Sequence, residues 1–183
     1  KAVTIYVDHK TRYNFAVFDN YMKPNSEQAI ENITKIQKKL NNHGHKIKSL
    51  RFDRESAYIA AATKDYMKTQ TIISATNRAS EQNLAEPKIS VVRERAPRII
   101  KARNIPKHLQ AYAYRHAIHL TNLLPTDALG GRTPYQEYFN KSPYRLLSRL
   151  HTFGSIAYYK RPELSKHEFA EPCIYLGFAD LNE

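Results

Sequence analysis

The hydrophobic period of the chain changes repeatedly within its first 52 residues, and this succession constrains the fold more than any other feature. Val3–Val7 and Tyr13–Phe18 are rich in β-branched and aromatic residues and predict two strands, joined by a polar turn at residues 8–12. A helical period follows Asn25, and Ile47–Phe52 returns to the alternation of a half-buried strand. Because the helix can cross over between parallel strands, this order predicts an α/β fold with a mixed sheet flanked by helices.

The helix after Asn25 carries signals at both ends. Asn25 and Gln28 have the spacing of a capping box. Gly44 is expected to end the helix, and the neighbouring His43 and His45 are interpreted as end-of-helix groups, because no Cys or acidic residue is spaced near them to complete a metal site.

The same periodicity predicts shorter elements further along the chain. Pro97 is expected to kink or break the helix that contains it, because proline lacks the N–H that a helix interior needs. The predicted elements are helices at Ile59–Met67, Glu86–Arg103, Lys107–Leu123 and Pro134–Phe139, strands at Thr71–Ser74, Ser155–Tyr159 and Cys173–Gly177, and a loop at Ala75–Asn83. On the third helix, His116 falls on the apolar face and is interpreted as a core histidine.

Composition shifts suggest three parts. Residues 1–125 are expected to form the α/β core domain, residues 126–141 a connector with one short helix after Gly130-Gly131, and residues 142–183 a small β-rich extension. Lys1 leads almost directly into a strand, so we expect a further strand upstream of the sequence.

The net charge of +12 points to a polyanionic partner, because a surplus of this size costs self-repulsion in the folded state. Nucleic acid is the leading candidate, an anionic membrane surface the second, and a solvated basic surface without a partner the third. No apolar run approaches the ~20 residues of a membrane span, and the single Cys173 excludes an internal disulfide. The densest basic run contains Lys88, Arg93, Arg95, Arg98, Lys101 and Arg103 and is the predicted DNA-binding segment.

Two carboxylates are candidates for a metal site beside this basic run. Asp53 follows the Leu50–Phe52 strand, and open α/β folds place working groups at strand ends, although Asp53 also suits an ordinary turn. Glu86 opens the basic helix. Carboxylates bind Mg²⁺, and two such ions can activate a nucleophile against a phosphodiester. Spacing alone is a weak signal, since two acids among 17 often fall this way by chance.

Several short motifs occur along nearly the whole chain in a fixed order. In these motifs the sequence resembles the integrases of Ty1/copia-type retrotransposons, as part of a Pol polyprotein. The matching segments are Val7–Tyr13, Leu50–Asp53, Glu81–Glu86, Thr121–Thr126, Gly131–Tyr135, Leu150–Gly154 and Tyr175–Phe178.

The resemblance implies an RNase H-like core with a two-metal Asp, Asp, Glu site that processes element DNA ends and joins them to target DNA. Asp53 corresponds to the second acid and Glu86 to the third. The first acid belongs to a strand preceding Val3 and has no match here; Asp8 matches a turn instead. The resemblance further implies Mg²⁺ or Mn²⁺ as cofactor, DNA and further copies of the chain as partners, no membrane, and a nuclear location with a cytoplasmic virus-like-particle stage.

The sequence also departs from the family around both acids. Glu55 stands where the family has Gly, Ala57 replaces an acid, Pro87 replaces Arg, and the glycine before Glu86 is missing. We therefore expect an integrase segment that is incomplete or inactive as it stands. The alternative is a non-catalytic DNA-binding or protein-interaction module derived from an integrase.

Overall fold

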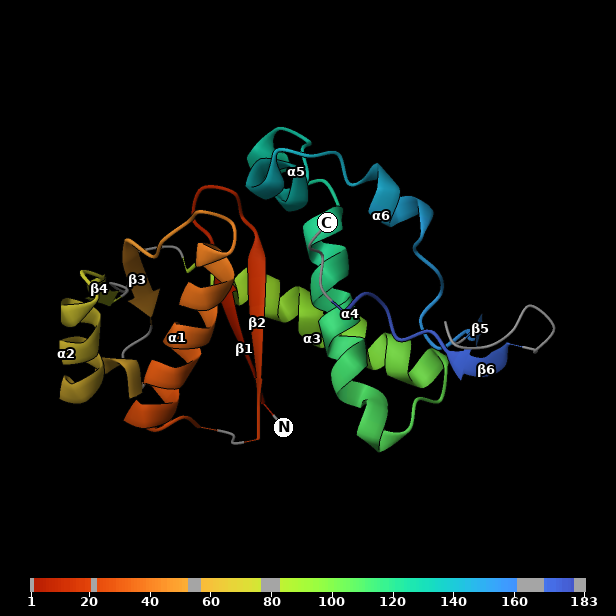
Figure 1. Cartoon of the computed structure of the whole chain (residues 1–183), viewed down its shortest axis with the longest axis horizontal. Coiled ribbons are helices and arrows are strands. Elements are labelled where there is room, and N and C mark those ends of the chain that lie inside the picture. Colours follow the sequence, from red (N-terminus) through yellow and green to blue (C-terminus); the bar gives the residue numbers. More distant parts are fainter. Residues whose placement is uncertain (1, 21–22, 53–56, 77–82, 161–169, 180–183) are drawn as a thin grey trace. The chain divides into compact units, whose positions relative to one another are not determined.

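The computed structural model describes residues 2–20, 23–52, 57–76, 83–160 and 170–179 of the 183-residue chain (Figure 1). The fold is mixed α/β, as predicted. The chain forms two compact units: unit 1 comprises Lys1–Tyr6 and Phe15–Glu86, and unit 2 comprises Val7–Asn14 and Pro87–Glu183. The three-part division predicted from composition stays a prediction. Among the described helices, none has the length and apolarity needed to cross a membrane.

The first two strands and the first helix lie where the sequence predicts them. Strands β1 (Ala2–Val7) and β2 (Asn14–Asp19) pair in a two-stranded sheet. Helix α1 (Ser26–Asn41) begins at the predicted capping box, in which Asn25 Oδ1 accepts from the Gln28 N–H at 2.9 Å. The Gln28 side chain in turn accepts from the Asn25 N–H at 2.9 Å. The chain turns at Gly44, whose φ of +74° suits glycine.

A parallel strand pair completes the regular structure of unit 1. Strand β3 (Ser49–Phe52) pairs in parallel with β4 (Ile73–Thr76), and the chain between them forms the 3₁₀ turn η1 (Ala57–Ile59) and helix α2 (Ala61–Thr69). The predicted elements are present, with β4 starting two residues later than expected. The core that holds them together consists of Ala29, Ile33, Tyr58, Met67 and Ile72.

Helix α3 (Ala85–Ala102) contains Pro97 and continues through it, so the predicted break is wrong. Pro97 removes the N–H that the Arg93 carbonyl would accept from. Arg93 and Pro97 are both exposed, whereas Ala96 in the same turn is fully buried and anchors the helix. Packing of the apolar face thus maintains the helix across a residue that weakens it locally.

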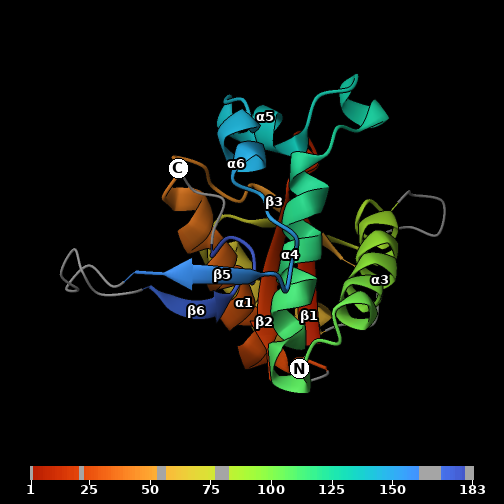
Figure 2. The ribbon, with the colours of Figure 1, turned by 90° about the vertical axis from the view of Figure 1, so that its right-hand side faces the viewer.

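The rest of unit 2 is helical until its last hairpin (Figure 2). Its elements are the 3₁₀ turn η2 (Lys107–Leu109), helix α4 (Gln110–Leu123), the 3₁₀ turn η3 (Asp127–Leu129), helices α5 (Pro134–Phe139) and α6 (Tyr144–Ser148), and strands β5 (Ile156–Tyr159) and β6 (Glu171–Ile174). The two strands pair antiparallel. Helix α6 was not predicted. Strand β6 starts two residues before the predicted strand Cys173–Gly177 and ends three residues before it does.

The core of unit 2 joins the two long helices to the C-terminal segment. Ile105, Ala113 and Phe153 are buried together, and partly buried side chains from α3, η2 and the segment after β6 pack against them: Ile99, Ile100, Leu109 and Leu176. This packing determines which face of α3 is turned away from solvent.

Candidate nucleic-acid interface

Glu86, the predicted third acid, lies where the sequence places it, in the first turn of α3. Its side chain is exposed, and just before it the Ala85 N–H donates to Asn83 Oδ1 at 3.0 Å. Asp53, the predicted second acid, lies outside the described residues. The pairing of Asp53 with Glu86 therefore stays a prediction.

The carboxylates of Asp53 and Glu86 have the right chemistry to bind a hard cation, because carboxylate oxygens are the protein ligands that Mg²⁺ prefers. Within the part of the chain that the structure describes, no three His, Cys, Asp or Glu side chains gather closely enough to hold a metal ion. A metal site at Glu86 would therefore need ligands from outside the described residues, and the predicted Asp53 is one such residue.

Asp19 is a buried carboxylate that the sequence did not single out. It is 5% exposed, accepts a hydrogen bond from Asn32 Nδ2 at 3.0 Å, and lies 4.0 Å from Lys35 Nζ. An amide and an ammonium group therefore compensate its burial. We interpret Asp19 as a structural group in unit 1.

The cations of the predicted DNA-binding segment divide into two sets. Arg93, Arg98 and Lys101 on α3 are exposed, as is Arg103 just after the helix. Of these, Arg98 forms an ion pair with Glu94 one turn before it.

The second set, Lys88 and Arg95, is half-buried. These residues are seven positions apart, which is two helical turns, so they lie on the same side of α3. Burial, followed by the positive charges of Arg12 and Arg95, lowers the pKa of Lys88 below its ordinary value.

Arg12 is a further half-buried cation whose charge acts on Lys88, and the sequence did not reveal it. It ends the turn after β1, where the Arg12 N–H donates to the Asp8 carbonyl at 2.9 Å and the backbone adopts a φ of 59°. The motif Val7–Tyr13 marks this turn, but no local signal shows that it approaches α3.

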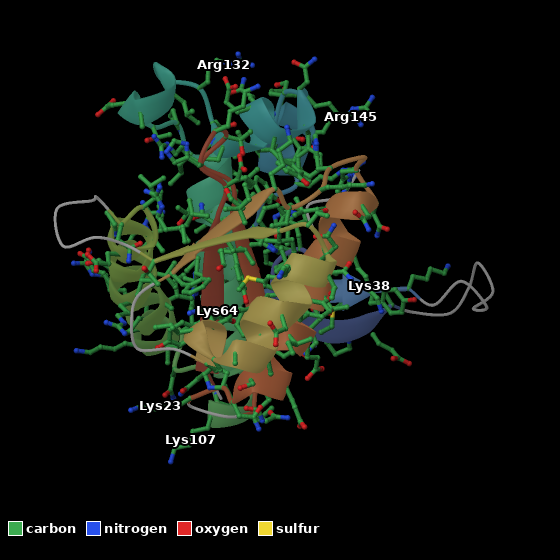
Figure 3. The ribbon with its side chains drawn as sticks, turned by 90° about the vertical axis from the view of Figure 1, so that its left-hand side faces the viewer. Lys23, Lys38, Lys64, Lys107, Arg132 and Arg145 are labelled. Carbon is green, nitrogen blue, oxygen red and sulfur yellow. The ribbon has the colours of Figure 1, made fainter. Side chains whose placement is uncertain are left out.

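Positive charge is also spread over other elements. Figure 3 shows Lys38 on α1 and Lys64 on α2, and both are exposed. Arg132, which precedes α5, instead pairs with Glu137 at 2.9 Å. The basic character of α3 therefore stands out by its density and by its half-buried cations.

His116 on α4 is a core histidine, as predicted. It is 5% exposed and its ring lies 5.2 Å from that of Phe153, measured between centroids. A β-carbon added at Gly177 would lie only 2.7 Å from His116 Nδ1. The motif segments Leu150–Gly154 and Tyr175–Phe178 also meet directly, since the Gly154 N–H donates to the Tyr175 carbonyl at 2.8 Å. These motifs therefore maintain the packing of unit 2.

The sequence is similar to parts of two curated plant proteins, while no protein-family profile matches it. The retrovirus-related Pol polyprotein from transposon RE1 of Arabidopsis thaliana is 27% identical over 182 residues. The corresponding polyprotein from transposon RE2 is 25% identical over 182 residues. Each match covers 96% of this chain and 12% of the polyprotein, so the chain spans only a small part of these relatives.

The solved structures of similar fold include two integrase catalytic core domains and a viral intasome. The chain matches a simian T-cell lymphotropic virus intasome, solved in complex with PP2A regulatory subunit B56 gamma, with a TM-score of 0.60 at 17% identity over 94% of this chain and 61% of that one. The HTLV-2 integrase catalytic core domain, in complex with magnesium and in trimeric form, gives a TM-score of 0.56 at 17% identity. This match covers 75% of this chain and 92% of the HTLV-2 chain. The BIV integrase catalytic core domain gives a TM-score of 0.58 at 14% identity, and the match covers 81% of this chain and 90% of the BIV chain. The expected RNase H-like fold is thereby confirmed.

Proposed function

We propose that this chain, an integrase-like segment of a retrotransposon Pol polyprotein, binds DNA through α3 and takes part in joining element DNA ends to target DNA. The observation that carries the proposal is the composition of α3. The candidate acid Glu86 lies in its first turn, and the exposed cations that follow outnumber the acidic residue among them, Glu94. An excess of exposed cations on one helix suits the phosphate backbone of nucleic acid.

The contacts proposed for α3 are independent of base sequence. Arg93 and Lys101 are exposed and reach outward from the helix, and Arg103 continues the series after its end. Long cationic side chains of this kind bind phosphate oxygens, which position DNA and do not read its bases. Their binding releases condensed counterions, so the affinity falls steeply with salt.

The proposed chemistry is processing and strand transfer of DNA ends with Asp53 and Glu86 as catalytic acids. These carboxylates would hold Mg²⁺ or Mn²⁺, which activates an attacking hydroxyl group or water and stabilises the leaving oxygen. The HTLV-2 integrase core solved with magnesium supports a divalent cation for this fold.

Self-association and nuclear action complete the proposal. The HTLV-2 integrase core was solved in trimeric form, which supports a homo-oligomer for this chain as well. Joining of DNA ends to a chromosomal target would take place in the nucleus.

DNA binding is tested with a fluorescent duplex titrated at several salt concentrations. Replacing Arg93 and Lys101 together by Gln should lower the slope of log affinity against log salt by about 2, since each phosphate contact contributes about 0.9. The control is the double replacement of Lys38 and Lys64 by Gln, which removes the same charge from α1 and α2. Equal slopes for the two double variants would contradict a specific role of α3.

Catalysis is tested on a Pol segment extended upstream of Lys1, with Mg²⁺ or Mn²⁺ and a labelled element end. Asp53→Asn or Glu86→Gln should abolish strand transfer while leaving DNA affinity within about twofold, because neither carboxylate attracts phosphate. Absence of strand transfer in the unmodified extended segment would contradict the catalytic part.

The altered surroundings of the acids favour a second candidate function. Pro87 follows Glu86 directly in the first turn of α3, where the family has Arg, and an arginine at this position would offer a phosphate contact. A non-catalytic DNA-binding module would bind duplex with the same salt dependence but join no ends, and its function would survive both acid substitutions.

A further inference from the structure

We propose that Arg12, Lys88 and Arg95 form a discrete binding site for a phosphate group, separate from the exposed cations of α3. With DNA as the ligand, the site rests on the proposed function and would hold one phosphodiester of the backbone. Inorganic phosphate shares this chemistry and serves as a probe that does not depend on DNA binding.

The site brings together two segments of unit 2 that are far apart in the sequence. Lys88 and Arg95 lie on one side of α3. Arg12 comes from the turn after β1 and is close enough for its charge to lower the pKa of Lys88, after the larger effect of burial. Lys88 thus lies within the electrostatic influence of two further positive charges, and all three side chains are half-buried.

One buried donor of this cluster is without a partner among the described residues. Arg12 Nη1 is buried and has no hydrogen-bond partner among the described residues. By contrast, Arg98 pairs with Glu94 and Arg132 pairs with Glu137. A buried donor without a partner costs folding free energy, and an anion bound there would offset that cost.

The turn that carries Arg12 is held firmly. Asp8 Oδ2 accepts from both the N–H and the hydroxyl group of Thr11, each at 2.7 Å. The Arg12 carbonyl accepts from Asn14 Nδ2 at 3.2 Å. The guanidinium group is therefore presented from a rigid turn, which lowers the entropy cost of binding.

Arginine is also an unfavourable residue for the backbone conformation at this position. Its φ of 59° lies in the left-handed region, which costs a residue other than Gly, Asn or Asp about 1 kcal/mol. A residue kept at an unfavourable backbone position is a candidate for a functional role of its side chain.

The residue types fit phosphate in particular. A guanidinium group presents N–H donors in a planar fork that matches two phosphate oxygens, and an ammonium group adds a compact charge. Two arginines and one lysine together match the several oxygens and the spread charge of one phosphate group.

The test compares Arg12→Asn with Lys10→Asn. Asn is well tolerated at positive φ, so Arg12→Asn removes the guanidinium group while keeping the turn folded. Lys10 is exposed in the same turn, and its replacement changes the net charge equally. Urea unfolding should show that both variants are as stable as the wild type.

The first measurement follows the side-chain NMR signal of Lys88 as inorganic phosphate is added. In the wild type and in Lys10→Asn, bound phosphate should raise the pKa of Lys88, because a nearby anion favours the charged ammonium form. In Arg12→Asn the phosphate concentration needed for half of this change should rise about tenfold. The same response in all three proteins, or none in the wild type, would overturn the proposal.

The second measurement is duplex DNA binding over a salt series. Arg12→Asn should lower the salt slope by about 1, and Lys10→Asn should leave it unchanged. If Lys88 responds to phosphate through Arg12 but no duplex binds, the phosphate site stands and the proposed function falls. If duplex binds equally to all three proteins and Lys88 does not respond, the proposed function stands and the phosphate site falls.

Discussion

Asn122 on α4 holds Asn14 at the start of β2 through three hydrogen bonds, although 108 positions separate them in the sequence. Asn122 Oδ1 accepts from the Asn14 N–H at 2.8 Å and from Asn14 Nδ2 at 2.7 Å. Asn122 Nδ2 donates to the Asn14 carbonyl at 2.9 Å. Both residues are buried. The side chain of Asn122 thus pairs the backbone polar groups that follow the turn carrying Arg12.

We expect Asn122→Ala to destabilise the protein by on the order of 3 kcal/mol, because it leaves a buried N–H and a buried carbonyl of Asn14 without partners. The measurement is urea unfolding followed by circular dichroism. Asn41→Ala, which removes an exposed amide at the end of α1, should change the free energy of unfolding by less than about 0.5 kcal/mol. Equal effects of the two substitutions would show that the Asn14–Asn122 contact contributes little.

Gly177→Ala should destabilise the protein by about 2–4 kcal/mol for two separable reasons. Its φ of +88° is unfavourable for alanine, and the new β-carbon would overlap His116 Nδ1. In a His116→Ala background only the backbone effect remains, so the same change should cost about 1–2 kcal/mol. A double-mutant cycle from urea unfolding measures the difference. A coupling energy of zero would mean that His116 moves aside freely.

Stability should fall as the pH falls below the ordinary pKa of histidine, about 6.5, and His116 should cause part of this loss. Burial lowers the pKa of His116, so the unfolded chain binds a proton before the folded protein does. The loss of stability due to His116 is absent above the unfolded-state pKa, grows as the pH falls towards the folded-state pKa, and then levels off. His116→Gln should reduce the slope of unfolding free energy against pH between 7 and 5. Identical slopes would show that His116 titrates alike in both states.

Most regular elements of the fold follow from local sequence. The strands β1 and β2 follow from alternation and β-branched residues, and α1 follows from its capping box and its apolar stripe. Helix α6 was not predicted because five residues are too few to show a helical period. Pro97 misled the prediction because burial of the neighbouring Ala96 outweighs a local preference.

The residues of the candidate site also fall into those that local sequence predicts and one that it does not. Glu86 was placed correctly at the start of α3, since an acid before an amphipathic run is a local signal. The exposed cations of α3 were visible as a charge run. Arg12 was missed because its role depends on its proximity to Lys88, and nothing in either segment alone specifies that approach.

The sequence by itself therefore determined the order and type of most elements, the basic character of α3, and the motifs that resemble integrases. Tertiary structure alone decided which polar groups meet: Asn14 with Asn122, His116 against Gly177, and Arg12 beside Lys88. The physical reason is that periodicity and capping depend on residues a few positions apart, whereas these contacts depend on how the buried faces of distant segments pack.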